Sequence, residues 1–216
     1  VIAGAGSGKT RVLTYRIAYM LTLGISPFQI LALTFTNKAA GEMKERIFKL
    51  VGDSNAKAVS MGTFHSIFYR IIRVEGYRLG YDHNVTVYDT DDCKSMIKSI
   101  VKEMQLDPKI YVANYILNRI SAAKSSLISE QEYAENPEII EADKRSGKPL
   151  IADIFKRYNQ RLKSANAMDF DDLLYYMNVL LRDYPEVLYK YQQRFRYILV
   201  DEYQDTNFAQ YLIIKK

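Results

Sequence analysis

The sequence is poor in cysteine and lacks long apolar runs. Cys93 is the single cysteine among 216 residues, so the chain cannot form an internal disulfide, which suits a reducing cytosol. No apolar run reaches the roughly 18 residues that a membrane-spanning helix needs, so we expect no membrane partner. No secretory signal is visible, although a chain that starts inside a motif could not show one. No internal repeat is present.

Composition and charge set broad limits on the class of protein. The chain is 48% hydrophobic, which at this length allows one large domain or two small ones, each with a buried core. Lysine and arginine exceed aspartate and glutamate by 30 to 25, a net charge of +5. This mildly basic balance permits an acidic partner such as nucleic acid but does not require one.

Strand-like and helix-like segments alternate over about the first 75 residues. The predicted strands are the end Val1–Ala3, Ile30–Phe35 and Ala58–Phe64; the predicted helices are Lys9–Leu23, a segment with Met43, Ile47 and Leu50 on one face, and His65–Val74. Alternation of this kind predicts βαβ units, hence an α/β fold with a parallel sheet and right-handed crossovers.

The pattern becomes mostly helical between Asp89 and Ala167. Thr90 is a candidate N-cap for the first of these helices, and Tyr111–Ala123 and Ile151–Leu162 predict two more. The charged stretch Ser129–Leu150 contains two prolines and a glycine, so we expect an exposed connection there.

Two more helices are predicted before the stretch "YILVDEYQDTN" near the end of the chain. Tyr197–Val200 reads as a central buried strand that carries two acidic residues at its carboxyl end. Ligand sites of open α/β sheets lie at that edge.

The opening stretch "VIAGAGSGKT" contains a phosphate-loop pattern with one relaxation, because an alanine replaces the first glycine. Small residues let backbone N–H groups surround phosphate oxygens, and the following helix adds its positive N-terminal end. In such a loop the lysine reaches the β- and γ-phosphates and the threonine hydroxyl is a ligand for Mg²⁺. The alternative is a flexible glycine-rich turn. The predicted phosphate-binding residues are Ala3, Gly4, Ala5, Gly6, Ser7, Gly8, Lys9 and Thr10.

Asp201 and Glu202 are candidates for the second half of a nucleotide site. A carboxylate at a strand end beside the loop can hold Mg²⁺, which assigns Asp201 and Thr10 to the metal. A neighbouring carboxylate can accept a proton from the attacking water, which makes Glu202 and Lys9 the catalytic candidates. Alone, such an acidic pair is more often solvated surface. The absence of a guanine-type N-K-x-D motif favours ATP over GTP.

Four stretches in this order, "AGAGSGKT", "TFTNKAAGEM", "GTFHSI" and "DEYQDTN", closely resemble the motor motifs of superfamily-one DNA helicases of the UvrD/Rep/PcrA group. "MDFDDLL" (Met168–Leu174) also resembles that group, and the resemblance extends over the whole chain. It implies a RecA-like P-loop NTPase fold that uses ATP and Mg²⁺. The first motor domain would comprise residues 1–88 and 168–216, with an all-helical accessory domain inserted at 89–167.

The resemblance also implies partners and further parts. The partners would be single-stranded and duplex DNA, with unwinding in the 3′ to 5′ direction in repair or replication, in a bacterial cytosol and near the nucleoid. A second motor domain of the same parent chain would supply arginines to the γ-phosphate, and an adenine-recognition segment would precede the loop. The fragment alone is expected to bind nucleotide weakly and not to unwind DNA.

The resemblance places two motifs along the path of single-stranded DNA. Aromatic rings could stack on bases and polar side chains could bind phosphates or bases, whereas ordinary core packing is the alternative for the rings and for the histidine. The predicted DNA-binding residues are Phe35, Thr36, Asn37, Thr63, Phe64 and His65, and Lys38 is either a phosphate contact or a solvated helix start.

Other functions remain open at the level of sequence. The motor could belong to a helicase–nuclease of the recombination type, which a nuclease module elsewhere in the parent would reveal. A nucleotide-gated binding module without catalysis is the second alternative. A DNA-binding fragment that uses no nucleotide is the third.

Overall fold

A computed structural model describes residues 8–216 of the chain. The predicted strand end Val1–Ala3 lies outside these residues. Contacts divide the chain into two compact units. The first takes in the chain up to Arg70 and from Leu181 to Lys216, and the second comprises Ile71–Leu180.

A parallel sheet forms the centre of the first unit. β1 (Ile30–Thr34) lies between β2 (Ser60–Thr63) and β5 (Tyr197–Val200), and both pairings are parallel. The register of β1 and β5 aligns Leu33 with Val200. The predicted α/β class with a parallel sheet is therefore confirmed.

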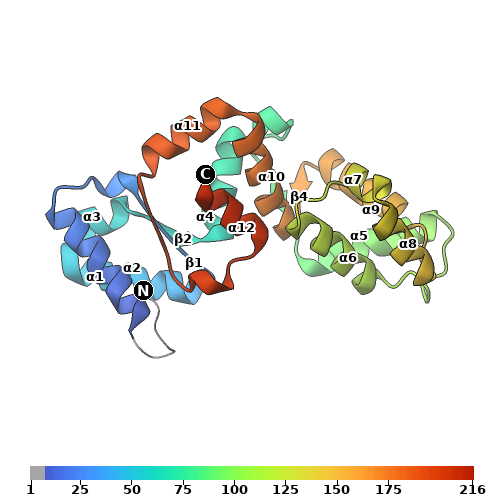
Figure 1. Cartoon of the computed structure of the whole chain (residues 1–216), viewed down its shortest axis with the longest axis horizontal. Coiled ribbons are helices and arrows are strands. Elements are labelled where there is room, and N and C mark those ends of the chain that lie inside the picture. Colours follow the sequence, from blue (N-terminus) through green and yellow to red (C-terminus); the bar gives the residue numbers. More distant parts are fainter. Residues whose placement is uncertain (1–7) are drawn as a thin grey trace. The chain divides into compact units, whose positions relative to one another are not determined.

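Helices cover both faces of this sheet. Their bounds are α1 (Lys9–Thr22), α2 (Asn37–Val51), α3 (Asp53–Ala58), α4 (Phe64–Glu75), α11 (Pro185–Arg194) and α12 (Phe208–Lys215). Figure 1 shows α1, α2 and α3 on one face and α4 and α12 on the other. Single turns of 3₁₀ helix, η1 (Pro27–Gln29) and η3 (Tyr203–Asp205), precede β1 and follow β5.

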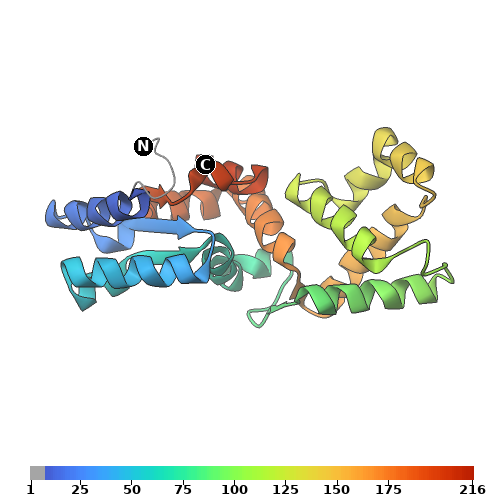
Figure 2. The ribbon, with the colours of Figure 1, turned by 90° about the horizontal axis from the view of Figure 1, so that it is seen from below.

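Apolar side chains of α1 and α2 form the core on one face of the sheet. Ile17, Met43 and Ile47 have no exposed surface and pack with Ile30 of β1. Burying each such side chain contributes about 1.5–3 kcal/mol. Figure 2 shows α1 and α2 side by side on this face. Leu50, expected on the same face of α2, is 40% exposed.

β5 is more exposed than the prediction of a central buried strand. Among residues 8–216 it pairs with β1 alone. Tyr197 and Ile198 are 40% and 41% exposed. An apolar run predicts burial in a sheet, but only the pairing of strands decides how many neighbours each strand has.

The second unit is mainly helical. Its elements are η2 (Gly76–Leu79), β3 (Thr86–Val87), α5 (Thr90–Glu103), α6 (Ala113–Ser125), α7 (Glu130–Glu135), α8 (Pro137–Arg145), α9 (Ile151–Ser164), β4 (Ala167–Met168) and most of α10 (Phe170–Asp183). Ile97, Ile116, Ile154 and Phe155 are fully buried in its core. β3 and β4 pair in parallel and bring the two ends of the helical stretch together.

The charged stretch Ser129–Leu150 is not the exposed connection that was predicted. It forms α7 and α8, and it buries Tyr133 and Asp143, which are joined by a 2.6 Å hydrogen bond from the tyrosine hydroxyl. Ser129 forms a capping box with α7 and Asn136 caps α8 ahead of its first-turn proline. These helix-start signals outweigh the polar composition. The cap of α5 was also misplaced by one position, because Asp89 and not Thr90 caps it.

A buried group of charges joins α6 to the start of α10. The Lys124 ammonium lies 2.7 Å from Asp169 Oδ2 and 2.7 Å from Asp172 Oδ1, and its side chain is 2% exposed. The Tyr158 hydroxyl donates to Asp169 Oδ2 at 2.9 Å. Burial opposes the charge of Lys124, but Asp172 and Asp169 raise its pKa above the ordinary value. We call Lys124, Asp169, Asp172 and Tyr158 the buried charge cluster. It explains two of the three aspartates of "MDFDDLL".

Along the chain, the boundaries between the two compact units fall inside α4 and inside α10. These positions differ from the predicted limits of the motor and accessory domains. A division by contacts shows which parts of the chain are compact but does not assign them a function. The predicted domains, residues 1–88 with 168–216 and residues 89–167, therefore stay a prediction. None of the helices within residues 8–216 is long and apolar enough to cross a lipid bilayer.

Candidate functional site

Three of the motifs, "TFTNKAAGEM", "GTFHSI" and "DEYQDTN", lie at the same edge of the sheet. The parallel register places the ends of β1 and β2 together by pairing Thr34 with Thr63. β5 ends beside them, and the Asp201 amide donates to the Leu33 carbonyl oxygen at 2.9 Å. The residues after each strand therefore gather at the carboxyl edge, where open α/β sheets bind ligands.

The N-terminus of α1, which is the positive end of the helix dipole, lies at this edge of the sheet. Gly8 is its N-cap with φ 82°, a left-handed conformation that glycine adopts without strain. The first turn of α1 carries Lys9 and no acidic side chain, so the helix dipole and the ammonium both favour an anion. The remaining predicted loop residues, Ala3, Gly4, Ala5, Gly6 and Ser7, lie outside the described part of the chain.

Thr10 and Asp201 are in direct contact. The Thr10 hydroxyl donates to Asp201 Oδ2 at 2.9 Å. Asp201 is 5% exposed, whereas Thr10 is half-buried. The structure thus brings the two predicted metal ligands together, and both present oxygen atoms, which are the ligands of a hard cation such as Mg²⁺.

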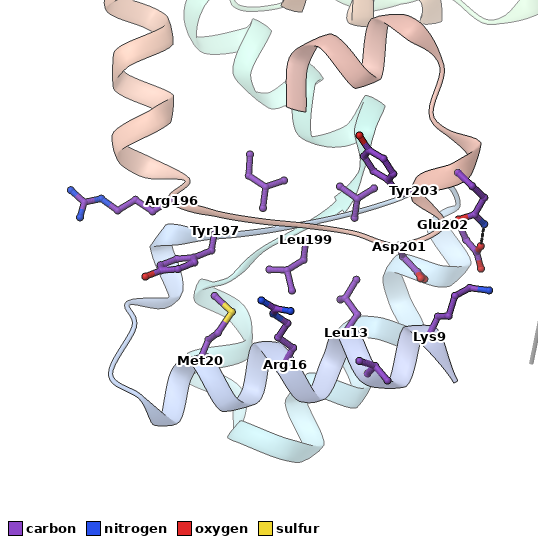
Figure 3. A pocket seen from close by; sticks show the side chains of 14 residues that line it. Lys9, Leu13, Arg16, Met20, Arg196, Tyr197, Leu199, Asp201, Glu202 and Tyr203 are labelled. Carbon is purple, nitrogen blue, oxygen red and sulfur yellow. Dashed lines mark hydrogen bonds between the residues drawn. The ribbon is translucent and has the colours of Figure 1, made fainter. Parts of the chain in front are cut away.

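Glu202 follows Asp201, and its backbone leaves the extended conformation of β5. Its φ of 53° is left-handed, which is unusual for a residue with a side chain. The half-buried carboxylate accepts a hydrogen bond from the Gln204 amide, drawn as a dashed line in Figure 3.

A cavity of about 540 Å³ runs between α1 and β5. Lys9, Asp201 and Glu202 lie at one end of it, and Met20, Arg196 and Tyr197 at the other (Figure 3). The end with the lysine and the two carboxylates combines an anion-binding group with cation-binding groups. That combination suits a phosphate chain with its metal ion.

The predicted DNA-binding residues divide by exposure. Thr36 and Asn37 are exposed, and Phe35 and His65 are half-buried. The Thr36 hydroxyl also caps α2, because it accepts from the Ala39 amide at 3.1 Å. Burial lowers the pKa of His65 below its ordinary value, which favours the neutral ring at pH 7.

Thr63 and Phe64 are buried instead. The Phe64 ring is 1% exposed and lies 5.4 Å from the Phe35 ring, centroid to centroid. Thr63 is 7% exposed and accepts a hydrogen bond from the Ser66 amide. In this conformation Phe35 is the ring of the pair that reaches the surface, and Phe64 supports it from below.

Sequence reasoning did not single out Gln204. The sequence shows that Gln204 lies two residues after Glu202, but a neutral amide does not by itself indicate a catalytic or metal-binding role. The left-handed turn that brings it back to the carboxylate became visible only in the structure.

These features define an open parallel α/β protein with a ligand site at the carboxyl edge of its sheet. Within this class, the profile of the UvrD/REP helicase N-terminal domain matches residues 1–216, so the chain belongs to that family. It is 42% identical over 220 residues to the ATP-dependent DNA helicase UvrD1 of Mycobacterium leprae and 45% identical over 216 residues to the ATP-dependent DNA helicase PcrA of Staphylococcus aureus. It is also 41% identical over 215 residues to PcrA of Leuconostoc citreum.

The matches cover nearly all of this chain but a small part of each relative. The match to UvrD1 spans 100% of the chain and 28% of the relative, and the match to PcrA of Staphylococcus aureus spans 100% and 29%. The match to PcrA of Leuconostoc citreum spans 99% of the chain and 28% of the relative. The chain thus corresponds to less than a third of each of these proteins.

Proposed function

We propose that this chain is the ATP-binding motor part of an ATP-dependent DNA helicase. The contact between Thr10 and Asp201 is the main support, because it joins a phosphate-loop hydroxyl to a strand-end carboxylate across the predicted nucleotide site. The names of the relatives point in the same direction. Residues 1–88 with 168–216 act as the first RecA-like motor domain, and residues 89–167 as its inserted accessory domain.

The phosphate site uses charge and backbone geometry. Lys9 binds the β- and γ-phosphates at the positive end of α1, and residues 3–8 are further predicted phosphate-binding residues. Thr10 and Asp201 hold Mg²⁺, whose small shell needs only one or two protein oxygens beside water and phosphate. When bound, the ion neutralises charge that develops on the phosphates.

Glu202 acts as the general base. It lies directly after Asp201 at the same end of the cavity, so its carboxylate can orient the attacking water and take its proton. Hydrolysis then depends on Lys9 for binding and on Glu202 for the chemical step.

Single-stranded DNA follows the ends of β1 and β2. Phe35 offers a stacking face and Thr36 and Asn37 offer hydrogen bonds, with His65, Thr63 and Phe64 at the next strand. These residues and the nucleotide site share one edge of one sheet. A change at the γ-phosphate can therefore reach the DNA through strands that are hydrogen-bonded to each other.

The parent protein contributes the remaining parts of the motor. A second motor domain supplies arginines to the γ-phosphate, and two domains that open and close on ATP drive movement, 3′ to 5′, along single-stranded DNA and the unwinding of duplex. The parent serves DNA repair or replication in the bacterial cytosol. Residues 1–216 alone bind nucleotide weakly and hydrolyse it slowly or not at all.

Replacement of Lys9 tests this proposal in a protein that carries the chain at the length of its relatives. Lys9→Ala should abolish DNA-stimulated ATP hydrolysis and unwinding in a fluorescent strand-separation assay. Lys49→Ala, on the exposed side of α2, is the matched control and should retain both activities. Unwinding that survives Lys9→Ala would refute the assigned role.

A further inference from the structure

The backbone at Glu202 is held in a conformation that its side chain disfavours. Its φ and ψ are 53° and 45°, and a residue with a Cβ atom in this region costs about 1–2 kcal/mol. The turn is closed by η3, in which the Asp205 amide donates to the Glu202 carbonyl oxygen at 2.9 Å. A strained backbone that neighbours keep in place is typical of functional sites.

This turn brings Gln204 back to the carboxylate of Glu202. The Gln204 amide nitrogen donates to Glu202 Oε2, and both residues line the cavity between α1 and β5. Gln204 is exposed where it lines the cavity, so its side chain has solvent as an alternative partner. The left-handed turn instead directs it to one carboxylate oxygen.

The chemistry of the amide suits a supporting role. A neutral N–H donor fixes the orientation of a carboxylate without neutralising it by an opposite charge. It engages Oε2 and leaves Oε1 as the oxygen that can accept from a water. A carboxylate that would otherwise rotate about its terminal torsion is thereby held in one orientation.

We propose that Gln204 is a positioning residue that orients the Glu202 carboxylate for its role as the base. The inference rests on the proposed function, in which Glu202 accepts the proton of the attacking water. Gln204 itself touches neither nucleotide nor water in this scheme. Its contribution is to the chemical step and not to nucleotide binding.

The expected result is a separation of kcat from KM. In the parent-length protein, Gln204→Ala should lower kcat for DNA-stimulated ATP hydrolysis about tenfold, which corresponds to about 1.4 kcal/mol. The KM for ATP and the affinity for a fluorescent ATP analogue should stay within twofold of the wild type. Gln131→Ala is the matched control, because this exposed glutamine of α7 also donates to a carboxylate, that of Glu135, and neither residue lines the cavity.

A charge at the same position gives a second readout that a structural role would not change. Gln204→Glu places a carboxylate beside Glu202, and the repulsion between the two negative charges should turn the Glu202 carboxylate away from position 204. kcat should then fall at least as far as in Gln204→Ala, while the KM for ATP again stays within twofold of the wild type. Wild-type kcat in both Gln204 variants would overturn the inference.

Glu202→Gln separates failure of the inference from failure of the proposed function. Glu202→Gln should retain ATP binding and abolish turnover, and adding Gln204→Ala to it should cause no further loss because the two residues act as one unit. If Glu202→Gln keeps full turnover, the proposed base is wrong. If Glu202→Gln is inactive but both Gln204 variants behave as the wild type, only the positioning role is wrong.

Discussion

The Thr10 hydroxyl lies 2.9 Å from the Asp201 carboxylate although 191 positions separate the two residues in the chain. The contact exists because α1 begins at the carboxyl edge of the sheet and β5 ends there. The intervening helical unit leaves and rejoins the first unit through α4 and α10. The insertion therefore lengthens the sequence between the two halves of the site without separating them in space.

Removal of the Thr10 hydroxyl should weaken metal-dependent nucleotide binding. Thr10→Val keeps the shape of the side chain but loses an oxygen ligand, so the tightening of ATP binding by Mg²⁺ should fall at least tenfold, or about 1.4 kcal/mol. Titration of a fluorescent ATP analogue with and without Mg²⁺ measures this. Thr10→Ser keeps the hydroxyl and should bind nearly as the wild type. Equal Mg²⁺ dependence in Thr10→Val would remove Thr10 from the metal site.

Loss of Lys124 should strongly destabilise the helical unit. Lys124→Met leaves Asp169 and Asp172 buried without their cation, and breaking a buried ion pair in this way costs about 3–5 kcal/mol. Urea unfolding followed by circular dichroism measures the free energy of unfolding. Lys144→Met, on the exposed side of α8, should change it by less than about 0.5 kcal/mol. Adding Asp169→Asn and Asp172→Asn to Lys124→Met should recover part of the loss, and no recovery would contradict this account.

The stability of the helical unit should fall as the pH rises from about 4 to about 7. Burial and the neighbouring Asp169 carboxylate raise the pKa of Asp172 to about 7, against the attraction of Lys124. A raised pKa in the folded state contributes stability that is complete below the unfolded value, near 4, declines between the two values, and is lost once the pH has passed about 7. Lys124 stays charged in this range, and the lowered pKa of Asp169 acts only in acid. Asp172→Asn should flatten the pH dependence of the urea midpoint, and an unchanged slope would count against Asp172 as its source.

A methyl group at Gly62 should disturb the motif "GTFHSI". A Cβ atom there would lie 2.5 Å from Ser66 Oγ and 3.3 Å from an Arg70 guanidinium nitrogen. Gly62→Ala should therefore destabilise the chain by about 1–3 kcal/mol in thermal or urea unfolding. Gly41→Ala is the matched control in α2, where a Cβ meets nothing within 4 Å, and it should stabilise by about 0.5–1 kcal/mol. Similar effects of the two substitutions would show that crowding at Gly62 is unimportant.

Local patterns predicted most of the first unit. Apolar residues that recur at the period of a helix predict α1 and α2. Ile17 of α1 and Met43 and Ile47 of α2, which belong to these patterns, are fully buried. The strand Ile30–Thr34 follows from its apolar run. Such features depend on neighbours along the chain, so the sequence carries them directly. The stretch Ser129–Leu150 shows the limit, because its charged composition predicts an exposed connection although Ser129 and Asn136 cap two helices.

By itself, the sequence determined the α/β class, the four motifs and the identity of the candidate residues, since each depends on residue types at short spacing. The tertiary structure decided what those residues touch. Strand pairing placed β5 beside β1, brought Asp201 to Thr10 and buried Phe64 beneath Phe35. A left-handed turn at Glu202 returned Gln204 to the carboxylate. Contacts between distant segments depend on the packing of the whole chain, and no local pattern in the sequence encodes that packing.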